Sequence, residues 1–273
     1  NFVHRINSIN RSIKGTSLKG KINGAVGNFN AHAIAYPDVN WEIVSRKFIK
    51  GLGLEVNTHT TQVEPKDSIA ELFFNYVRLN NVLIDFSRDI WGYISLGYFK
   101  QKLKKGEIGS STMPHKVNPI DFENAEGNLG LANSNFQHLS NTVVISRWQR
   151  DLTDSTVMRN IGLCYGHTNL ALSSLLKGVY KLEINKDQLK HDLDSSWEVL
   201  TEAMQTIFRK HLIKDGYELM KELSRGKKIS KEDLHNLIDK IDIPSEEKNA
   251  LKNLTPSSYT GIANTLAKQL KDS

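Results

Sequence analysis

The sequence is poor in cysteine and has no long apolar run. Cys164 is the single cysteine in 273 residues, so no disulfide can form within the chain. No stretch approaches the roughly 18 uninterrupted apolar residues of a membrane span. Residues 1–20 spread His4 and Arg5 through an apolar pattern, unlike a secretory signal peptide. These absences exclude a disulfide-stabilised domain and a membrane-spanning protein, and we expect a reducing, cytoplasmic location.

Positive charge is in modest excess, with 36 Lys and Arg against 30 Asp and Glu. Residues 177–273 hold 17 basic against 16 acidic residues, so most of the net charge of +6 falls in residues 1–176. An excess of this size favours the electrostatic steering of a small anionic substrate. The chain has no basic stripe interleaved with aromatic residues, as nucleic-acid-binding domains have, so we expect no nucleic-acid partner.

Helical periodicity dominates the chain and predicts an all-α fold. Three patterns are longer than an ordinary globular helix: residues 66–99, 118–139 and 155–180. Ile69, Leu72 and Tyr76 begin the apolar stripe of the first pattern. Either Asp67 or Ser68 can cap its start. A helix of thirty residues is roughly 45 Å long. Such helices cannot bury their stripes alone, so we expect a bundle of long helices that is shared between subunits.

Residues 1–65 show shorter patterns. A helical pattern already runs at residue 1 without a capping residue, which indicates that the chain begins inside a helix. Gly20, Gly24 and Gly27 form no phosphate-binding fingerprint, so we expect turns or close packing there. A short helix is expected to start near Trp41 and to stop near Gly51.

The pattern changes again near residue 180, beyond which the elements are shorter and the charges alternate in sign. Ser230 and Asp233 resemble a capping box for a short helix that ends near Ile241. We therefore expect two domains, a central long-helix bundle over residues 1–180 and a small helical carboxy-terminal domain over residues 181–273.

A polar segment from Gly106 to Pro119 joins the first two long helices, with two glycines and three hydroxyl side chains. A segment of this composition between rigid helices is typical of a lid or a catalytic loop. A polar linker between helices is the simpler interpretation. At its exit, Asn118 followed by Pro119 predicts an N-cap with proline in the first helical turn.

Residues 109–119 read GSSTMPHKVNP. They resemble the signature G-S-S-x-M-P-x-K-x-N-P of the fumarase–aspartase superfamily, whose members form or consume fumarate by elimination. The resemblance implies that Ser110 is the general base, an alkoxide that fixed donors must hold in a closed site. Lys116 supplies positive charge to the substrate carboxylate, and Asn118 can donate to the same group. Glu123 matches the residue that orients the catalytic histidine, although a solvated carboxylate in a first helical turn is otherwise commoner.

Residues 147–160 read RWQRDLTDSTVMRN and bring arginines and hydroxyl side chains to the start of a helix. Such a cluster suits phosphate binding, although a capped helix with surface arginines would look similar. The stretch resembles the nucleotide-binding segment of bacterial-type adenylosuccinate lyases, as do residues 21–28, 60–65 and 121–129 in their own positions. The resemblance assigns substrate contacts to Gln62, Asn118, Asn124, Arg150, Ser155, Thr156 and Arg159.

The resemblance also implies a reaction and an assembly. The reaction is the anti β-elimination of fumarate from adenylosuccinate to give AMP, and from the succinylated aminoimidazole carboxamide ribotide, without a metal or an organic cofactor. The assembly is a homotetramer in which each active site collects segments from three subunits. The family's general acid is a histidine in an S-x-T-H-G-Q-like motif that these residues lack, so we expect the family's amino-terminal part to be absent.

Two alternatives stay open at this point. One is another fumarate-forming lyase of the superfamily, such as argininosuccinate lyase or fumarase. The other is a non-catalytic oligomeric scaffold built on the same fold, which the presence of Ser110, Lys116 and Asn118 disfavours.

Overall fold

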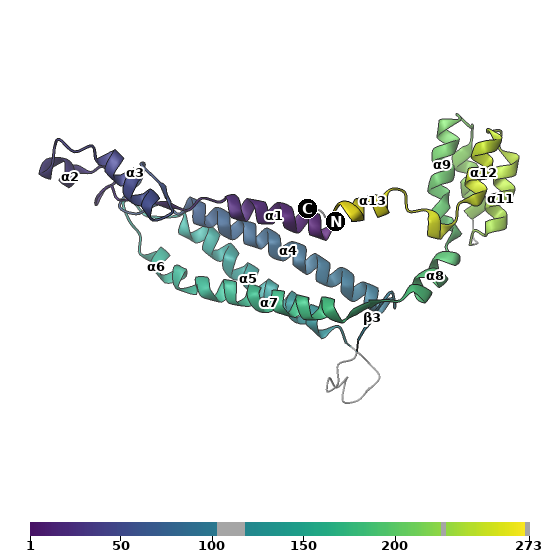
Figure 1. Ribbon diagram of the computed structural model, residues 1–273, viewed down its shortest axis with the longest axis horizontal. Helices are drawn as coiled ribbons and strands as arrows, with labels where there is room; N and C mark the ends of the chain where they lie inside the picture. The colour runs from purple at the N-terminus through teal and green to yellow at the C-terminus, as the bar shows by residue number, and fades with distance from the viewer. Residues whose placement is uncertain (103–117, 225–227, 271–273) are drawn as a thin grey trace. The chain divides into compact units, whose positions relative to one another are not determined.

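A computed structural model describes residues 1–102, 118–224 and 228–270, and these residues are mostly helical (Figure 1). They form two compact units. The first unit comprises residues 1–96 and 101–183, and the second comprises residues 97–100 and 184–273. The predicted all-α fold is confirmed, since the strands are only two or three residues long. Within the described ranges, no helix combines the length and the apolar character that crossing a bilayer requires.

Three long helices form the body of the first unit: α4 (Asp67–Ser95), α5 (Ile120–Val143) and α7 (Ile161–Lys181). Helix α5 packs antiparallel along both of the others (Figure 1). Apolar side chains recur along α5 at steps of three and four and are almost completely buried: Phe122, Ala125, Leu129, Ala132, Phe136 and Leu139. Burial of each large one contributes roughly 1.5–3 kcal/mol to stability. Helix α1 (Phe2–Gly15) packs along α4.

Aromatic side chains fill the bundle near the start of α7. Tyr76 stacks on Phe136 with ring centroids 5.4 Å apart, and Tyr165 meets both rings edge-on. Burial raises the pKa of Tyr165 to about 12, because a phenolate would lose its solvation there. Val157 and Ile161 pack against the same cluster. The cluster therefore fixes the chain that leads into α7.

The segment before α4 folds into two short helices and a parallel strand pair: α2 (Asn30–Ala35), α3 (Trp41–Gly51), β1 (Lys19–Gly20) and β2 (Glu55–Val56). The short helix expected between Trp41 and Gly51 is confirmed. Gly24 and Gly27 have φ of +86° and +79°, and a Cβ on Gly27 would collide with the carbonyl oxygen of Thr60. A Cβ on Gly20 would press on Ile49. These glycines serve turns and close packing, as predicted.

The third predicted long helix is divided. Helix α6 (Thr153–Val157) and a 3₁₀ turn (Met158–Asn160) precede α7, so the pattern over residues 155–180 covers three elements. The interruption falls at Asn160, whose φ of −92° and ψ of 1° depart from the helix. Side-chain periodicity continues across such a turn, and for this reason the sequence does not reveal it.

The predicted caps of the first two long helices are wrong. Lys66, in the left-handed conformation, is the N-cap of α4, and Pro119 is that of α5. The Ser68 hydroxyl instead accepts from the backbone N–H of Lys19 at 3.4 Å. The Glu64 carboxylate accepts from the N–H of Lys66 at 2.7 Å. The Ser68 hydroxyl thus contacts a neighbouring segment instead of capping α4, while Asn118 lies one residue too early to be the N-cap of α5.

The second unit is built from short helices: α8 (Lys186–Asp194), α9 (Thr201–Lys210), α10 (Gly216–Ser224), α11 (Lys231–Lys240), α12 (Ser245–Asn253) and α13 (Ala263–Gln269). Two 3₁₀ turns cover Trp197–Leu200 and Pro256–Ser258, and β3 (Phe99–Gln101) pairs with β4 (Leu182–Ile184). Ser230 and Asp233 form the predicted capping box, and α11 ends at Lys240.

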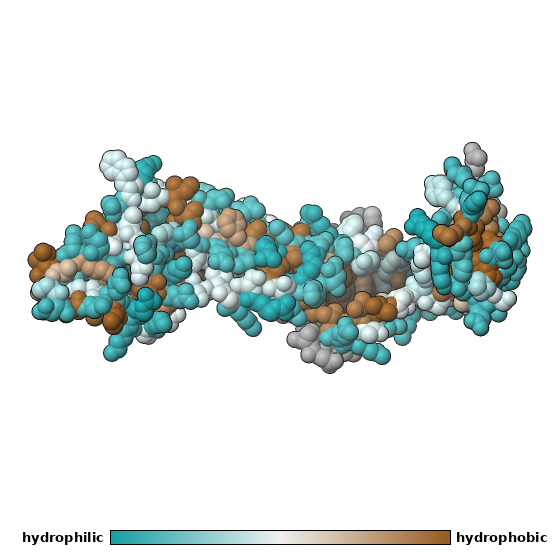
Figure 2. All heavy atoms as spheres, turned by 90° about the horizontal axis from the view of Figure 1, so that it is seen from above, coloured by the Kyte–Doolittle hydropathy of each residue, from teal (hydrophilic) through white to brown (hydrophobic). Residues whose placement is uncertain are grey.

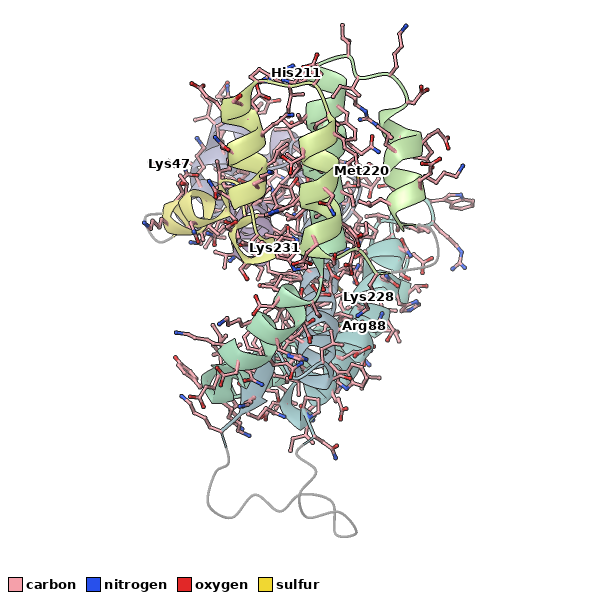
Figure 3. All side chains as sticks on the ribbon, turned by 90° about the vertical axis from the view of Figure 1, so that its right-hand side faces the viewer. Lys47, Arg88, His211, Met220, Lys228 and Lys231 are labelled. Carbon is pink, nitrogen blue, oxygen red and sulfur yellow. The ribbon has the colours of Figure 1, made fainter. Side chains whose placement is uncertain are left out.

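The core of the second unit joins Met204 and Phe208 of α9 to Met220 of α10 and Ile238 of α11. Figure 3 labels Met220 and also His211, whose Nε2 lies 2.8 Å from a carboxylate oxygen of Glu247 on α12. This pair and the core hold α9, α10, α11 and α12 together as a helical unit.

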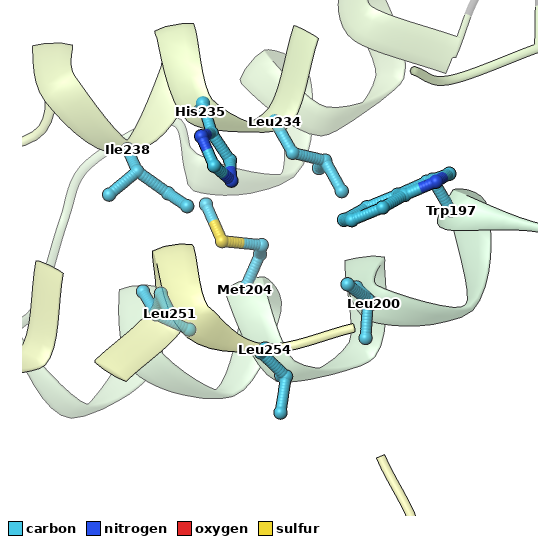
Figure 4. A pocket seen from close by; sticks show the side chains of 8 residues that line it. All are labelled: Trp197, Leu200, Met204, Leu234, His235, Ile238, Leu251 and Leu254. Atoms are coloured by element: carbon cyan, nitrogen blue, oxygen red, sulfur yellow. The ribbon is translucent and has the colours of Figure 1, made fainter. Parts of the chain in front are cut away.

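A cavity in this core is lined by Trp197, Met204, His235 and their apolar neighbours (Figure 4). It encloses about 10 Å³, which is room for about one water molecule. Nε2 of His235 is buried there without a hydrogen-bond partner among the described residues. The cavity is too small for a substrate, so we place no active site in it.

Close packing between α5 and α7 gives a first prediction. A Cβ at Gly178 would lie 2.8 Å from the ring of Phe122, which is only 1% exposed and has no room to move. Gly178→Ala should therefore destabilise the protein by about 1–3 kcal/mol in urea unfolding, because the added methyl group overpacks the core. At Gly15 a Cβ meets nothing within 4 Å, so Gly15→Ala should be neutral or slightly stabilising. Equal effects of the two changes would contradict this packing.

Candidate active site

The candidate residues fall into two groups within the first unit. One group lies around α6: Gln62, Arg150, Ser155, Thr156 and Arg159. The other lies at the start of α5: Asn118, Glu123 and Asn124. Ser110 and Lys116 lie outside the described residues.

The two groups lie toward opposite ends of α5. This helix has 24 residues and is roughly 36 Å long at 1.5 Å per residue. Asn118, Glu123 and Asn124 are at its start, whereas α6 packs against it near its end (Figure 1). No single small molecule can contact both groups of one chain, because a nucleotide is far shorter than this helix.

Gln62 is held in place through its backbone. Its N–H donates to the carbonyl of Gln149 at 3.2 Å, which brings it beside the arginine stretch. Nζ of Lys21 donates to the carbonyls of Gly24, Thr61 and Gln62 at 2.7–2.9 Å. Burial lowers the pKa of Lys21. The side chain of Gln62 is exposed. These hydrogen bonds thus fix the backbone of Gln62 and leave its carboxamide accessible.

The entry to α6 is organised by a carboxylate. Asp151 accepts hydrogen bonds from the N–H and the hydroxyl of Thr153 at 2.9 and 2.8 Å, which lower the pKa of this carboxyl. Arg147 pairs with the same carboxylate at 2.9 Å and is 84% exposed. Arg147 therefore has a partner of its own, whereas the exposed Arg150 takes part in no ion pair with the residues that the structure describes.

The three candidate residues beyond Asp151 are exposed on α6 and the 3₁₀ turn. Ser155 donates its hydroxyl to the carbonyl of Leu152 at 2.9 Å. Thr156 and Arg159 lie one and four residues further on. The hydroxyls of Ser155 and Thr156 on α6, with Arg150 before this helix and Arg159 after it, form a surface that suits an anion.

An ion pair ties α6 to the start of α4. Nζ of Lys66 lies 2.6 Å from Oδ2 of Asp154, and the two side chains are only 18% and 13% exposed. The hydrogen bond from Lys66 and its charge hold the pKa of Asp154 below its ordinary value, with a smaller contribution from Arg150. The predicted site did not include Lys21, Lys66 or Asp154. Spacing alone gives no sign that residues so far apart in the sequence meet.

At the other end, Glu123 has a neighbour that the sequence did not suggest. Its Oε1 accepts a hydrogen bond from the indole Nε1 of Trp91 on α4 at 3.1 Å. The carboxylate remains exposed, and its second oxygen has no hydrogen-bond partner among the described residues. Glu123 is therefore oriented by α4, which is compatible with a role in orienting another group.

Asn118 is half-buried just before α5, and Asn124 is exposed on its first turns. The Asn124 carboxamide accepts hydrogen bonds from Ser174 and Asn128. Among the described residues, no group of three or more His, Cys, Asp or Glu side chains is placed to hold a metal ion.

The Lys66–Asp154 pair gives a second prediction. Asp154→Asn leaves a poorly exposed ammonium without its counter-charge and should cost about 2–3 kcal/mol near neutral pH in urea unfolding. The folded carboxyl has a lowered pKa, so its stabilisation is present above its ordinary pKa of 3.8 and is lost as the pH falls through the folded value. The difference between wild type and variant should therefore shrink in acid.

The matched control is Glu126→Gln in the same unit. Glu126 pairs at 2.7 Å with Arg88, which Figure 3 labels, and these side chains are 37% and 68% exposed. This exposed pair should contribute at most about 1 kcal/mol. A loss in Asp154→Asn that is no larger than in the control, or that does not change with pH, would show that the Lys66–Asp154 pair is unimportant.

Two family models match the chain. The model described as "Lyase" matches residues 3–132, and the model described as "Adenylosuccinate lyase C-terminal" matches residues 146–260. The fold is similar to a crystal structure of fumarate lyase from Mesorhizobium sp. BNC1, with a TM-score of 0.67 at 16% identity, covering 100% of this chain and 62% of that one.

Curated relatives give closer similarity. The chain is 54% identical over 271 residues to the adenylosuccinate lyases of Buchnera aphidicola subsp. Schizaphis graminum and of Escherichia coli K12. Each match covers 99% of this chain and 59% of the relative, so the chain spans about three-fifths of their length. Because the similarity extends over 99% of its residues, the chain belongs to the adenylosuccinate lyase family.

Proposed function

We propose that the protein containing this chain eliminates fumarate from adenylosuccinate to give AMP, and from the succinylated aminoimidazole carboxamide ribotide in the same way. The observation that carries the proposal is 54% identity to adenylosuccinate lyases over 99% of the chain, with the signature GSSTMPHKVNP intact at residues 109–119. The single cysteine further favours a reducing compartment, and we infer a cytoplasmic enzyme.

In the proposed mechanism, Ser110 removes the β proton of the succinyl group as an alkoxide. The electron pair of that C–H bond first accumulates on the adjacent carboxylate, where Lys116 and Asn118 stabilise the negative charge. The pair then forms the carbon–carbon double bond of fumarate while the C–N bond breaks. A histidine outside these residues protonates the departing nitrogen, and Glu123 orients that histidine.

The phosphate of the nucleotide is proposed to bind around α6. Arg150 and Arg159 supply charge, and Thr156 supplies a hydroxyl donor. Ser155 supplies a second donor by exchanging its hydrogen bond to the carbonyl of Leu152 for one to the ligand. Gln62, whose backbone lies beside this stretch, contacts the same ligand with its exposed carboxamide. The modest positive excess in residues 1–176 favours the approach of this anion.

We further propose a homotetramer in which each active site draws on three subunits. The separation of the two groups along α5 supports this, because the start of α5 and the α6 region must then come from different copies. Apolar side chains also remain at the surface of α5 and α7, with Leu131 53%, Leu163 50% and Leu170 59% exposed. Figure 2 shows apolar patches among polar ones along this unit. A second copy would bury them.

The assay follows the fall in ultraviolet absorbance as the full-length protein converts adenylosuccinate to AMP. Argininosuccinate and fumarate serve as alternative substrates for the other lyases of the superfamily. Turnover of one of these, without turnover of adenylosuccinate, would replace the proposed function. If the protein had the mass of a tetramer in solution but turned over none of these substrates, a non-catalytic scaffold would be favoured.

Ser110→Ala should lower turnover in this assay while substrate binding changes little. Loss of general base catalysis is worth about 10²–10⁴-fold in rate. Steady-state kinetics separate the two effects, since the loss should appear in kcat rather than in KM. A variant that kept half of the wild-type kcat would show that Ser110 is not the base.

Arg150→Ala should weaken AMP binding in calorimetric titration, because a charge-assisted pair to phosphate contributes roughly 1.5–3 kcal/mol. Arg147→Ala is the matched control, three residues earlier in the same stretch. Its guanidinium is engaged by Asp151, so its removal should affect AMP affinity much less. Unchanged affinity in a folded Arg150→Ala protein would make Arg150 structural.

A further inference from the structure

A chain of polar side chains crosses from α5 to α7 beside the start of α5. Its members are Asn124 and Asn128 on α5, and His167 and Ser174 on α7. Residues 124 and 128 are one helical turn apart, and residues 167 and 174 are two turns apart. Because the helices are antiparallel, Ser174 faces Asn124 and His167 faces Asn128.

Hydrogen bonds determine the orientation of the Asn128 carboxamide. Its Nδ2 lies 2.9 Å from the backbone carbonyl oxygen of Asn124, which can only accept. Oδ1 of Asn128 must then be the atom that lies 2.8 Å from Nδ1 of His167. Nδ1 of His167 therefore bears a hydrogen and donates a hydrogen bond to Oδ1 of Asn128. The imidazole thus holds Asn128 in this orientation.

Asn128 in turn determines the orientation of Asn124. Nδ2 of Asn128 also lies 3.2 Å from Oδ1 of Asn124, so this atom is the acceptor oxygen. The hydroxyl of Ser174 donates to the same oxygen at 2.8 Å. Both donors engage the oxygen, and among the described residues nothing accepts from the Nδ2 group of Asn124. That group belongs to an exposed side chain and is available to a ligand.

From this geometry we propose that Asn128 and Ser174 are positioning residues that fix Asn124 with its NH₂ group toward the ligand, where it donates to an anionic oxygen. The inference rests on the proposed function, which makes Asn124 a substrate contact. Orientation matters because a rotated carboxamide would present its oxygen and repel an anion. Either the succinyl carboxylate or the phosphate could supply the acceptor.

The first experiment tests the direction of donation. Asn124→Asp keeps the size of the side chain and the acceptor for Ser174, but it turns an oxygen toward the ligand. Asn124→Ala removes the donor only. Affinities for fumarate and for AMP are measured separately by calorimetry, with the full-length protein. The Asp variant should bind one of them at least about 10-fold more weakly than wild type and more weakly than the Ala variant. Equal or better binding by the Asp variant would overturn the proposal.

The second experiment tests positioning. Ser174→Ala removes a donor to Asn124 and should weaken the same ligand roughly 3- to 10-fold, leaving the other ligand unaffected. Ser174→Thr retains the hydroxyl and should restore binding to within about 2-fold. Ser173→Ala is the matched control, because Ser173 is exposed and Ser174, not Ser173, makes the hydrogen bond to Asn124. This variant should bind both ligands as wild type does.

The results of these experiments distinguish an error in the proposed function from an error in this inference. If the wild-type protein binds neither AMP nor fumarate and does not turn over adenylosuccinate, the proposed function is wrong, and this inference is wrong as well. If wild type is active but Ser174→Ala matches Ser173→Ala, only the inference is wrong. A purely structural role for Ser174 would weaken both ligands equally, and that result also overturns the inference. Loss confined to fumarate identifies the carboxylate as the acceptor, and loss confined to AMP identifies the phosphate.

Discussion

Helix α5 buries apolar side chains along most of its length against two neighbours, α4 and α7, and the positions of the candidate groups depend on this packing. Ala125, Leu129 and Ala132 are completely buried. Small and large side chains alternate there, so the helices approach closely and cannot slide without loss of contacts. The start of α5 is thereby fixed beside the middle and end of its partners, and its end is fixed beside α6.

The same packing separates the two groups of candidate residues. A helix cannot bend back on itself, so residues at its two ends stay a helix length apart. Among the described residues, the bundle of long helices therefore provides rigid positions but does not bring the two groups of one chain together. Assembly of several copies is the way in which such a fold can bring the two ends together, and this is why the proposed function includes an oligomer.

Charged and polar contacts then set the details at each end. Lys21 gathers three carbonyl groups beside Gln62, and Lys66 holds α6 through Asp154. At the start of α5, Trp91 orients Glu123 and Ser174 orients Asn124. The Lys66–Asp154 pair is poorly exposed, whereas Glu123 and Asn124 remain exposed at the start of α5. These contacts hold the side chains that are proposed to meet the ligand, and they come from elements distant in the sequence.

Several features could be predicted from the sequence alone because they depend on local or periodic patterns. These were the all-α fold, the long helices, the short helix at Trp41, the glycine turns and the capping box at Ser230. The eleven-residue signature indicated the fumarase–aspartase superfamily, and residues 147–160, with residues 21–28, 60–65 and 121–129, indicated the adenylosuccinate lyase family. Only the tertiary structure decided the caps of α4 and α5, the break at Asn160, the Lys66–Asp154 pair and the network around Asn124. The reason is physical: periodicity reports which face of a helix is apolar, whereas these features depend on which side chains of different elements meet.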